Sequence, residues 1–348
     1  MRAGWGLLLA LWACGDEVEP PDGGALDSGP ADTGQVLDVG LDAAVFDQGA
    51  DAGPADLSFA DAAPPDADPV DLGPIDPLVG RGTVELVAEG FTFTEGPQWI
   101  EADGTLLFSD INGNTIHRLT PPAAISPYRM PSNNSNGLAI DVQGRLLAAE
   151  HGARRVSVAT LGQAEVTLVE RYQGQQLNSP NDLVVRSDGT IYFTDPPYGL
   201  GNRQREVPFN GVYRIDPLGA LEVEWEGPLS SRPNGIALSP DEQVLYVADT
   251  VGLVRAYDVL GSGALTNERT LVPNISGPDG MAVDSAGNLY VTAGTGVEVY
   301  GPDGHSFGVI PVPRQPANCA FGGADHRTLY ITARQGLYRV SLSIPGLP

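Results

Sequence analysis

Residues 95–110 read EGPQWIEADGTLLFSD, and the same pattern returns five more times before the C-terminus. Each copy opens with a few polar, Gly or Pro residues, continues as an apolar run, passes a turn and ends in a second apolar run. The other five copies are NGLAIDVQGRLLAAEH (136–151), NDLVVRSDGTIYFTDP (181–196), NGIALSPDEQVLYVAD (234–249), DGMAVDSAGNLYVTAG (279–294) and NCAFGGADHRTLYITA (318–333). Successive copies begin 39 to 53 residues apart. A repeat of this period with two or more strands per unit is typical of β-propeller blades.

Further short apolar runs follow each copy and complete a blade of four strands. Two such runs follow each of the first five copies, whereas only GLYRVSL follows the sixth. Residues 83–88, TVELVA, precede the first copy and are predicted to supply the missing outer strand of the last blade. Closing the ring in this way removes an exposed sheet edge. The sequence therefore predicts an all-β, six-bladed propeller with four-stranded blades over residues 81–348.

The chain before this domain has a different composition. Residues 15–80 contain no Lys or Arg and 16 Asp or Glu, set among Ala, Gly and Pro. Such a stretch buries too little apolar surface to offset the entropy lost on ordering, so it is predicted to be a disordered, acidic tether.

The first 14 residues, MRAGWGLLLALWAC, combine a positive charge at Arg2 with a short apolar run that ends at Cys14. This resembles a bacterial lipoprotein signal peptide with Cys14 as the lipidation site; the alternative is an ordinary secretory signal. We expect a lipid-anchored protein of the bacterial cell envelope, otherwise a periplasmic or secreted one. Because Gly15 follows the cysteine, the outer membrane is the expected location.

The composition of residues 81–348 excludes some partners. The domain carries 18 Arg and 28 Asp or Glu, without a basic stripe, which argues against nucleic acid as a partner. The whole chain has two cysteines, so a disulfide framework is excluded. The oligomeric state is not predicted.

The first residue of every repeat is a candidate for function. A propeller brings these positions to one end of its central channel. They are Glu95, Asn136, Asn181, Asn234, Asp279 and Asn318. Two carboxylates and several amide oxygens at one channel mouth describe a site for a hard cation, with Ca²⁺ preferred and Mg²⁺, Mn²⁺ or Zn²⁺ as alternatives. The competing interpretation is that Asn-Gly and Asp-Gly pairs are ordinary turns.

Eight short motifs resemble those of the senescence-marker-protein/gluconolactonase/luciferin-regenerating-enzyme family, and bacterial gluconolactonases most of all. The resemblance covers residues 83–342. The motifs are EGPQW, LNSPND, FTDPPYG, FNGVYRID, RPNGIALSPD, LYVADT, PDGMAVD and NCAFGG. It implies a six-bladed propeller that holds one divalent cation through Glu95, Asn181, Asn234 and Asp279.

The resemblance also implies that a small-molecule lactone or a related ester is hydrolysed at this cation. On chemical grounds Asp279 is the candidate general base, because it can bind the cation with one oxygen and take a proton from water with the other. Chemistry on aryl esters or phosphoesters is the first alternative, because the same centre can polarise a phosphoryl oxygen. A propeller that only binds protein or glycan is the second.

Further residues near the predicted mouth are candidates for substrate binding. They are His151, Asp182, Asn136, Tyr198 and Asn318. Asp195 and Tyr198 of the FTDPPYG motif are candidates to shape the pocket, and the favoured alternative is a turn fixed by proline with a packed tyrosine. Family members that act on sugar lactones often carry an arginine near the PND motif, where this chain has Asn178-Ser179-Pro180. Arg203 and Arg205 lie in the loop that follows.

Overall fold

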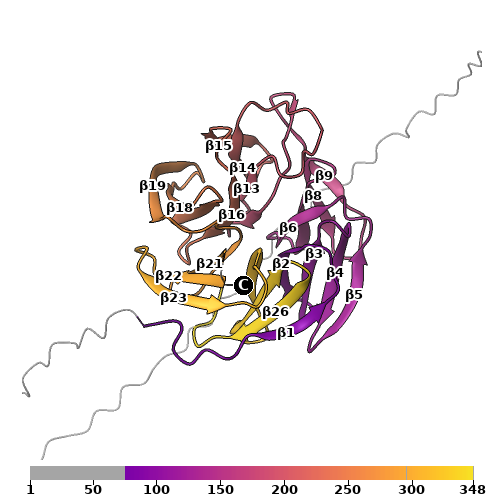
Figure 1. Ribbon diagram of the computed structural model, residues 1–348. Helices are drawn as coiled ribbons and strands as arrows, with labels where there is room; N and C mark the ends of the chain where they lie inside the picture. Colours follow the sequence, from indigo (N-terminus) through magenta and orange to yellow (C-terminus); the bar gives the residue numbers. More distant parts are fainter. Residues whose placement is uncertain (1–74, 295, 348) are drawn as a thin grey trace, which may run out of the picture. The chain divides into compact units, whose positions relative to one another are not determined.

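The computed structural model describes residues 75–294 and 296–347, in which β-strands are joined by turns and loops. Within these residues the strands form six four-stranded sheets and one two-stranded ribbon. Figure 1 shows the six sheets arranged around a common axis. The predicted six-bladed β-propeller is confirmed.

Each blade is an antiparallel sheet that runs outward from the channel in chain order, except the sixth. Blades 1 to 3 consist of β2 (Thr94–Ile100), β3 (Thr105–Asp110), β4 (Thr115–Thr120), β5 (Ala124–Arg129); β6 (Ser135–Ile140), β7 (Arg145–Glu150), β8 (Arg155–Thr160), β9 (Val166–Val169); and β12 (Leu183–Val185), β13 (Ile191–Asp195), β14 (Asn210–Ile215), β15 (Leu221–Gly227). Blades 4 and 5 consist of β16 (Pro233–Leu238), β17 (Val244–Asp249), β18 (Leu253–Val259), β19 (Leu265–Pro273); and β20 (Met281–Val283), β21 (Leu289–Ala293), β22 (Gly296–Tyr300), β23 (Ser306–Pro311). The ribbon between blades 2 and 3 pairs β10 (Arg171–Tyr172) with β11 (Gln175–Gln176).

The sixth blade joins the two ends of the domain. Its strands are β24 (Asn318–Gly322), β25 (Thr328–Ala333), β26 (Gly336–Ser341) and, outermost, β1 (Glu85–Glu89). β1 pairs antiparallel with β26, with Glu85 opposite Arg339 and Glu89 opposite Gly336. Residues 83–88 were predicted to supply this outer strand, and the prediction is confirmed with a shift of one or two residues at each end.

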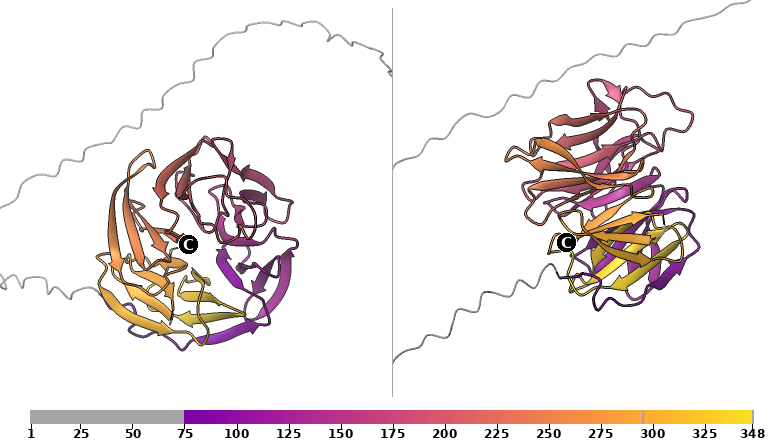
Figure 2. Two further views of the ribbon diagram at one scale, coloured as in Figure 1. Left: turned by 45° about the horizontal axis from the view of Figure 1, so that its top comes forward. Right: turned by 60° about the vertical axis from the view of Figure 1, so that its left-hand side comes forward.

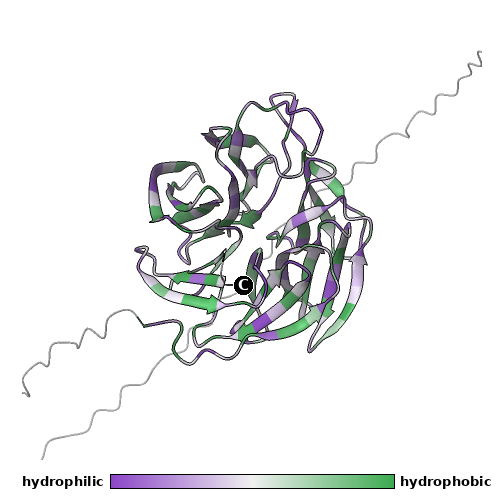
Figure 3. Ribbon diagram, in the orientation of Figure 1, coloured by the Kyte–Doolittle hydropathy of each residue, from purple (hydrophilic) through white to green (hydrophobic). Residues whose placement is uncertain are grey.

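The hydrophobic core is divided among the contacts between blades. The described residues form six buried apolar clusters, and each cluster combines residues of two neighbouring blades. The innermost strands contact one another around the ring, and β24 closes it against β2. Figure 3 shows the hydrophobic residues along the strands, and Figure 2 shows the ring from two further directions. The near-continuous apolar character of the inner strands therefore reflects burial against two neighbouring blades.

The N-terminal predictions lie mostly beyond the part of the chain that the structure describes. These are the signal peptide at 1–14, the lipidation site at Cys14 and the acidic tether as far as residue 74. Ahead of the boundary predicted at residue 81, Pro77 is already buried and Leu78 packs against the cluster between blades 5 and 6. Across residues 75–294 and 296–347 we find no helix with the length and hydrophobicity needed to span a bilayer.

Candidate functional site

The first residues of the six repeats gather at one end of the channel. Four lie on inner strands, Glu95 on β2, Asn136 on β6, Asn234 on β16 and Asn318 on β24, while Asn181 and Asp279 come just before β12 and β20. Five of the six side chains are only 2–5 % exposed. Asp279 is partly exposed and is therefore the member of the group that solvent can reach.

Glycines behind these residues bring neighbouring blades into close contact. A Cβ atom on Gly235 would lie 2.2 Å from the backbone oxygen of Asp279, and one on Gly96 would lie 2.1 Å from that of Asn136. The Gly235 N–H donates to this same Asp279 oxygen at 2.9 Å. The Asn-Gly pairs at 136 and 234 lie inside β6 and β16, so their interpretation as turns is wrong. Glycine is present because no side chain fits between adjacent inner strands.

Three carboxyl groups, of which those of Glu95 and Asp182 belong to buried residues, affect one another at this end of the channel. Burial raises the pKa of Glu95 well above its usual range, and the negative charges of Asp279 and Asp182 raise it further. Burial, followed by the charge of Asp182, raises the pKa of Asp279 to about 7. Burial also raises the pKa of Asp182 to about 7. Such a group is costly to ionise unless a positive charge lies among the carboxylates.

Amide side chains fill the space between these carboxylates. The Nδ2 of Asn318 donates to Asp182 Oδ2 at 3.2 Å. The Nδ2 of Asn234 donates to Thr250 Oγ1 at 3.2 Å, and the Asn234 side chain also contacts the Asp279 carboxylate. The Oδ1 of Asn136 is buried and has no hydrogen-bond partner. Buried oxygens without partners are rare in proteins and point to a missing ligand.

These residues fit a cation bound by carboxylates and amides together. In the described residues, no three His, Cys, Asp or Glu side chains are grouped so as to hold a metal ion. A cation here would therefore need amide oxygens beside Glu95 and Asp279. The mutual repulsion of the buried carboxylates and the unpartnered Asn136 oxygen both favour such a ligand.

His151 and Tyr198, both predicted near the mouth, lie there. His151 is 7 % exposed, and its Nε2 lies 3.4 Å from Asn136 Nδ2. Burial, helped by the positive charge of Arg203, lowers the pKa of His151 to about 4, so the ring is neutral at pH 7. Tyr198 is 45 % exposed, and its hydroxyl lies near the side chains of Thr250 and Asn234. These two side chains thus flank the polar group.

Asp195 has a structural role, in line with the turn interpretation that the sequence favoured for its motif. Its side chain is fully buried and accepts hydrogen bonds from the backbone N–H groups of Asn178 and Ser179. Burial raises the pKa of its carboxyl to about 7, although both hydrogen bonds favour the ionised form.

The two loop arginines also have structural partners. Arg203 donates to the carbonyl oxygens of His151 at 2.7 Å and Gly152 at 2.6 Å. Arg205 donates to Phe209 O and to the side-chain oxygens of Asn178 and Asn210. Both side chains thus fasten the loop to neighbouring backbone and amide groups.

A second set of residues at the mouth was not anticipated as a group. These residues directly follow the second strand of each blade, as His151 follows β7. Thr250 after β17 contacts Asn234, and the positive charge of Arg334 after β25 partly opposes the rise that burial causes in the pKa of Asp279. Thr250 and Arg334 occupy the position in their repeats that His151 has in the second repeat. An alignment of the six repeats extended by one residue past the second apolar run would therefore have identified them.

A cavity of about 430 Å³ lies along the channel behind the polar group. Asp182 and Asn318 line it together with apolar inner-strand residues such as Leu138 and Ile236. Leu347, near the C-terminus, also lines the cavity and donates its N–H to Val283 O. The polar site is therefore backed by a channel whose lining combines apolar inner-strand residues with polar ones such as Gln98 and Asp141.

A six-bladed propeller with buried carboxylates and amides at one channel mouth is the class of protein that the fold and the site define. The sequence matches the family model described as SMP-30/Gluconolactonase/LRE-like region over residues 93–335. The chain belongs to this family.

Relatives of known name agree with this membership. A gluconolactonase of Zymomonas mobilis is 37 % identical over 290 residues, which cover 74 % of this chain and 80 % of the relative. A pentonolactonase of Haloferax volcanii is 28 % identical over 70 % of this chain and 81 % of the relative. The solved structure of a gluconolactonase from Xanthomonas campestris superposes with a TM-score of 0.70 at 37 % identity, covering 74 % of this chain and 89 % of that one.

Proposed function

We propose that this protein is a cation-dependent lactonase that hydrolyses a small lactone at the channel mouth. The observation that carries the proposal is the proximity of the Glu95 and Asp279 carboxylates to each other and of the Asn234 amide to Asp279. Asn181 occupies the equivalent position just before β12 of blade 3. The gluconolactonase and pentonolactonase relatives support lactones as the substrate class.

The cation would be held by Glu95, Asn181, Asn234 and Asp279, of which the two carboxylates balance the charge of a divalent ion. An all-oxygen set of this kind suits Ca²⁺. When bound, the ion would polarise the lactone carbonyl and stabilise the negative charge that develops on its oxygen.

Asp279 is the group in the best position to act as general base. Asp279 as a residue is partly exposed, whereas Glu95 is only 4 % exposed. Asp279 would take a proton from the attacking water as the oxygen of that water bonds to the carbonyl carbon. The ring C–O bond then breaks, and its oxygen leaves with a proton as the hydroxyl of the hydroxy acid.

Neutral side chains around the mouth would orient the substrate. His151 is a neutral imidazole at pH 7, and Asn136 carries an unpartnered oxygen beside it. The Tyr198 hydroxyl lies next to Asn234 and Thr250. Together with Asp182 and Asn318, these groups offer donors and acceptors to the hydroxyls of a polar lactone.

The test compares two substitutions at the proposed ligands. At saturating Ca²⁺, Asp279→Asn should lower kcat by roughly 10²–10⁴-fold, because it removes a proton acceptor. Asn234→Ala should lower kcat far less. It removes one neutral ligand, and the excess of Ca²⁺ compensates for the weaker binding of the ion. The activity of both variants is measured as proton release during hydrolysis of δ- and γ-lactones. Wild-type protein in the presence of a chelator is the reference.

Equal, mild losses in the two variants would contradict the base role of Asp279. Turnover of an aryl ester or a phosphoester without any lactone turnover would move the assignment to that related chemistry. Cation binding without any hydrolysis would indicate a propeller that only binds.

A further inference from the structure

Three blades carry a buried aspartate at the end of the second strand, next to the segment that leads into the first. These are Asp110 at the end of β3, Asp195 at the end of β13 and Asp249 at the end of β17. Asp110 is 5 % exposed and the other two are fully buried. None of the three is among the residues assigned to the cation or the substrate.

Asp195 holds the backbone directly before Asn181. Its Oδ2 accepts from the N–H of Asn178 at 2.7 Å, and its Oδ1 accepts from the N–H of Ser179 at 2.7 Å. These donors lie three and two residues before Asn181, separated from it by Pro180. One carboxylate therefore fixes the turn from which the proposed ligand projects.

Asp110 makes the same contacts in front of Glu95. Its Oδ2 accepts from the N–H of Thr92 at 3.0 Å, and its Oδ1 accepts from the N–H of Phe93 at 2.9 Å. Thr92 and Phe93 again lie three and two residues before the proposed ligand. The Thr92 hydroxyl donates to Asp110 as well.

Asp249 repeats the arrangement in front of Asn234. Its Oδ1 accepts from the N–H of Arg232 at 2.7 Å, two residues before Asn234. The hydroxyl of Ser231, three residues before Asn234, donates to Asp249 Oδ2. The offset from carboxylate contact to proposed ligand is thus the same in three blades.

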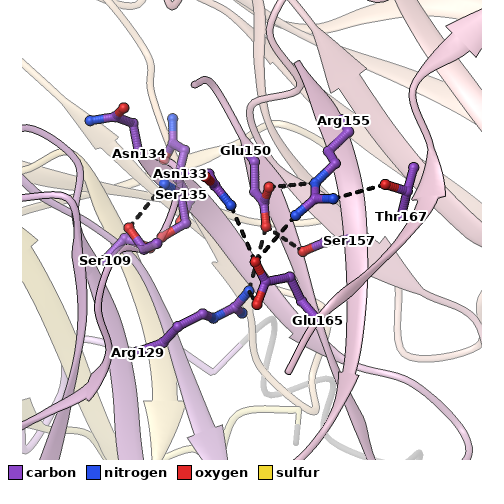
Figure 4. Close-up of polar contacts among 12 residues, drawn as sticks. Ser109, Arg129, Asn133, Asn134, Ser135, Glu150, Arg155, Ser157, Glu165 and Thr167 are labelled. Carbon is purple, nitrogen blue, oxygen red and sulfur yellow. Dashed lines mark hydrogen bonds and ion pairs between the residues drawn. The ribbon is translucent and has the colours of Figure 1, made fainter. Parts of the chain in front are cut away.

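The other three blades close without this contact, so the propeller fold does not require it. In blade 2 the corresponding residue is Glu150, whose carboxylate turns to Arg155, Ser157 and Arg129, as Figure 4 shows. In blades 5 and 6 the corresponding residues are Ala293 and Ala333, which have no carboxylate. Three of the four proposed cation ligands follow a carboxylate contact, whereas the blades of Asn136 and Asn318 lack one.

We propose that Asp110, Asp195 and Asp249 are positioning residues that hold Glu95, Asn181 and Asn234 in place for cation binding. This inference rests on the proposed function. A carboxylate that accepts from two successive backbone positions fixes the local turn before any ligand arrives. Prearranged ligands bind a metal more tightly than ligands that must first be ordered, and residues that orient ligands contribute to metal affinity in this way.

The test measures Ca²⁺ binding by calorimetry to the chelator-stripped full chain. Asp195→Asn keeps the size of the side chain but places an NH₂ group against one of the two backbone N–H donors. We expect Asp195→Asn and Asp249→Asn each to raise the Kd for Ca²⁺ by roughly 10–100-fold. The melting temperature of the cation-free protein is recorded beside each titration.

Asp284→Asn is the matched control. Asp284 is also fully buried and accepts from two backbone N–H groups, those of Ala286 at 3.0 Å and Asn288 at 2.9 Å. It lies in the turn after β20, at the far end of that strand from Asp279. The control should lower the melting temperature and leave the Kd for Ca²⁺ unchanged.

An unchanged Kd in Asp195→Asn and Asp249→Asn would overturn the inference, as would an equal loss of affinity in Asp284→Asn. If Asp195→Asn does not fold, Asp249→Asn and Asp110→Asn carry the same comparison. A wild type that binds no Ca²⁺ would instead remove the cation from the proposed function, and this inference with it. Failure of the proposed function is thus seen in the wild type alone, whereas failure of this inference is seen only when the variants are compared with a wild type that binds Ca²⁺.

Discussion

His151 shows how burial sets the state of a single side chain at the mouth. Burial and the positive charge of Arg203 lower its pKa to about 4, so the imidazole is neutral at pH 7. A neutral Nε2 can accept from Asn136 Nδ2, 3.4 Å away, which leaves the Asn136 oxygen free for another partner. If Nε2 accepts this hydrogen bond, the single proton of the neutral ring is on Nδ1; this tautomer is assigned from the contact with Asn136.

The low pKa of His151 predicts a specific dependence of stability on pH. Between pH 4 and about 6.5 the unfolded chain binds a proton that the folded protein does not, so this residue favours folding less as the pH falls through that range. Relative to His151→Gln, the wild type should lose about 3 kcal/mol of unfolding free energy between pH 7 and pH 4. Urea titrations at several pH values measure the difference.

The exposed His305 supplies the control for this experiment as His305→Gln. Wild-type and His151→Gln stabilities that follow parallel curves from pH 7 to pH 4 would contradict the neutral imidazole.

At the scale of the element, the distance between neighbouring inner strands is set by the small residues at their points of contact. Gly96, Gly137, Gly235 and Gly280 each follow a mouth residue, and a Cβ on any of them would meet an atom of the next blade within 2.4 Å. In blade 3 the position is taken by Asp182, whose side chain reaches Asn318. The spacing of the inner strands, and with it the distance between proposed ligands, therefore depends on glycine.

Gly235→Ala should consequently push blades 4 and 5 apart. The new Cβ would lie 2.2 Å from Asp279 O, a backbone atom with little freedom to move. We expect a loss of roughly 1–3 kcal/mol in unfolding free energy, together with weaker binding of Ca²⁺. Denaturant unfolding and calorimetry measure the two effects.

Gly261→Ala is the control for packing, because a Cβ there meets no atom within 4 Å. Its stability should stay within about 0.5 kcal/mol of the wild type. The close-approach argument fails if Gly235→Ala is as stable as Gly261→Ala.

At the scale of the whole molecule, the ring is closed by a strand from the other end of the domain. β1 covers the outer edge of β26, and Glu85 forms an ion pair with Arg339 at 2.9 Å. An uncovered β26 would present unpaired N–H and C=O groups to other chains.

A domain that begins at Gly90 should therefore be less stable than one that begins at Asp76. Loss of the β1–β26 hydrogen bonds is expected to cost a few kcal/mol, or roughly 5–10 °C in melting temperature. Calorimetry gives the melting temperatures, and light scattering detects association through the free edge. Equal melting temperatures for the two chains would show that β1 does not help to close the ring.

The fold was largely predictable because the repeat is local. Turn and strand signals recur within each copy, and six copies of one unit leave few arrangements other than a ring. Because the last repeat lacked one strand, the apolar run before the first repeat could be recognised as its outer strand, β1. The same alignment selected the first residue of all six repeats as neighbours, since equivalent positions of a propeller share one end of the channel. The family resemblance then singled out Glu95, Asn181, Asn234 and Asp279 among them.

The sequence by itself thus determined the blades, their number and the polar residue at the start of each. Only the tertiary structure decided the roles that depend on contacts between segments distant along the chain. It showed that Gly137 and Gly235 of the Asn-Gly pairs lie in close contact between inner strands rather than in turns. It also showed that Asp195 binds the backbone before Asn181, and that Arg203 binds the carbonyl oxygens of His151 and Gly152. The physical reason is that a local pattern encodes which strand forms, whereas the partner of a buried polar group is chosen by the blade packed against it.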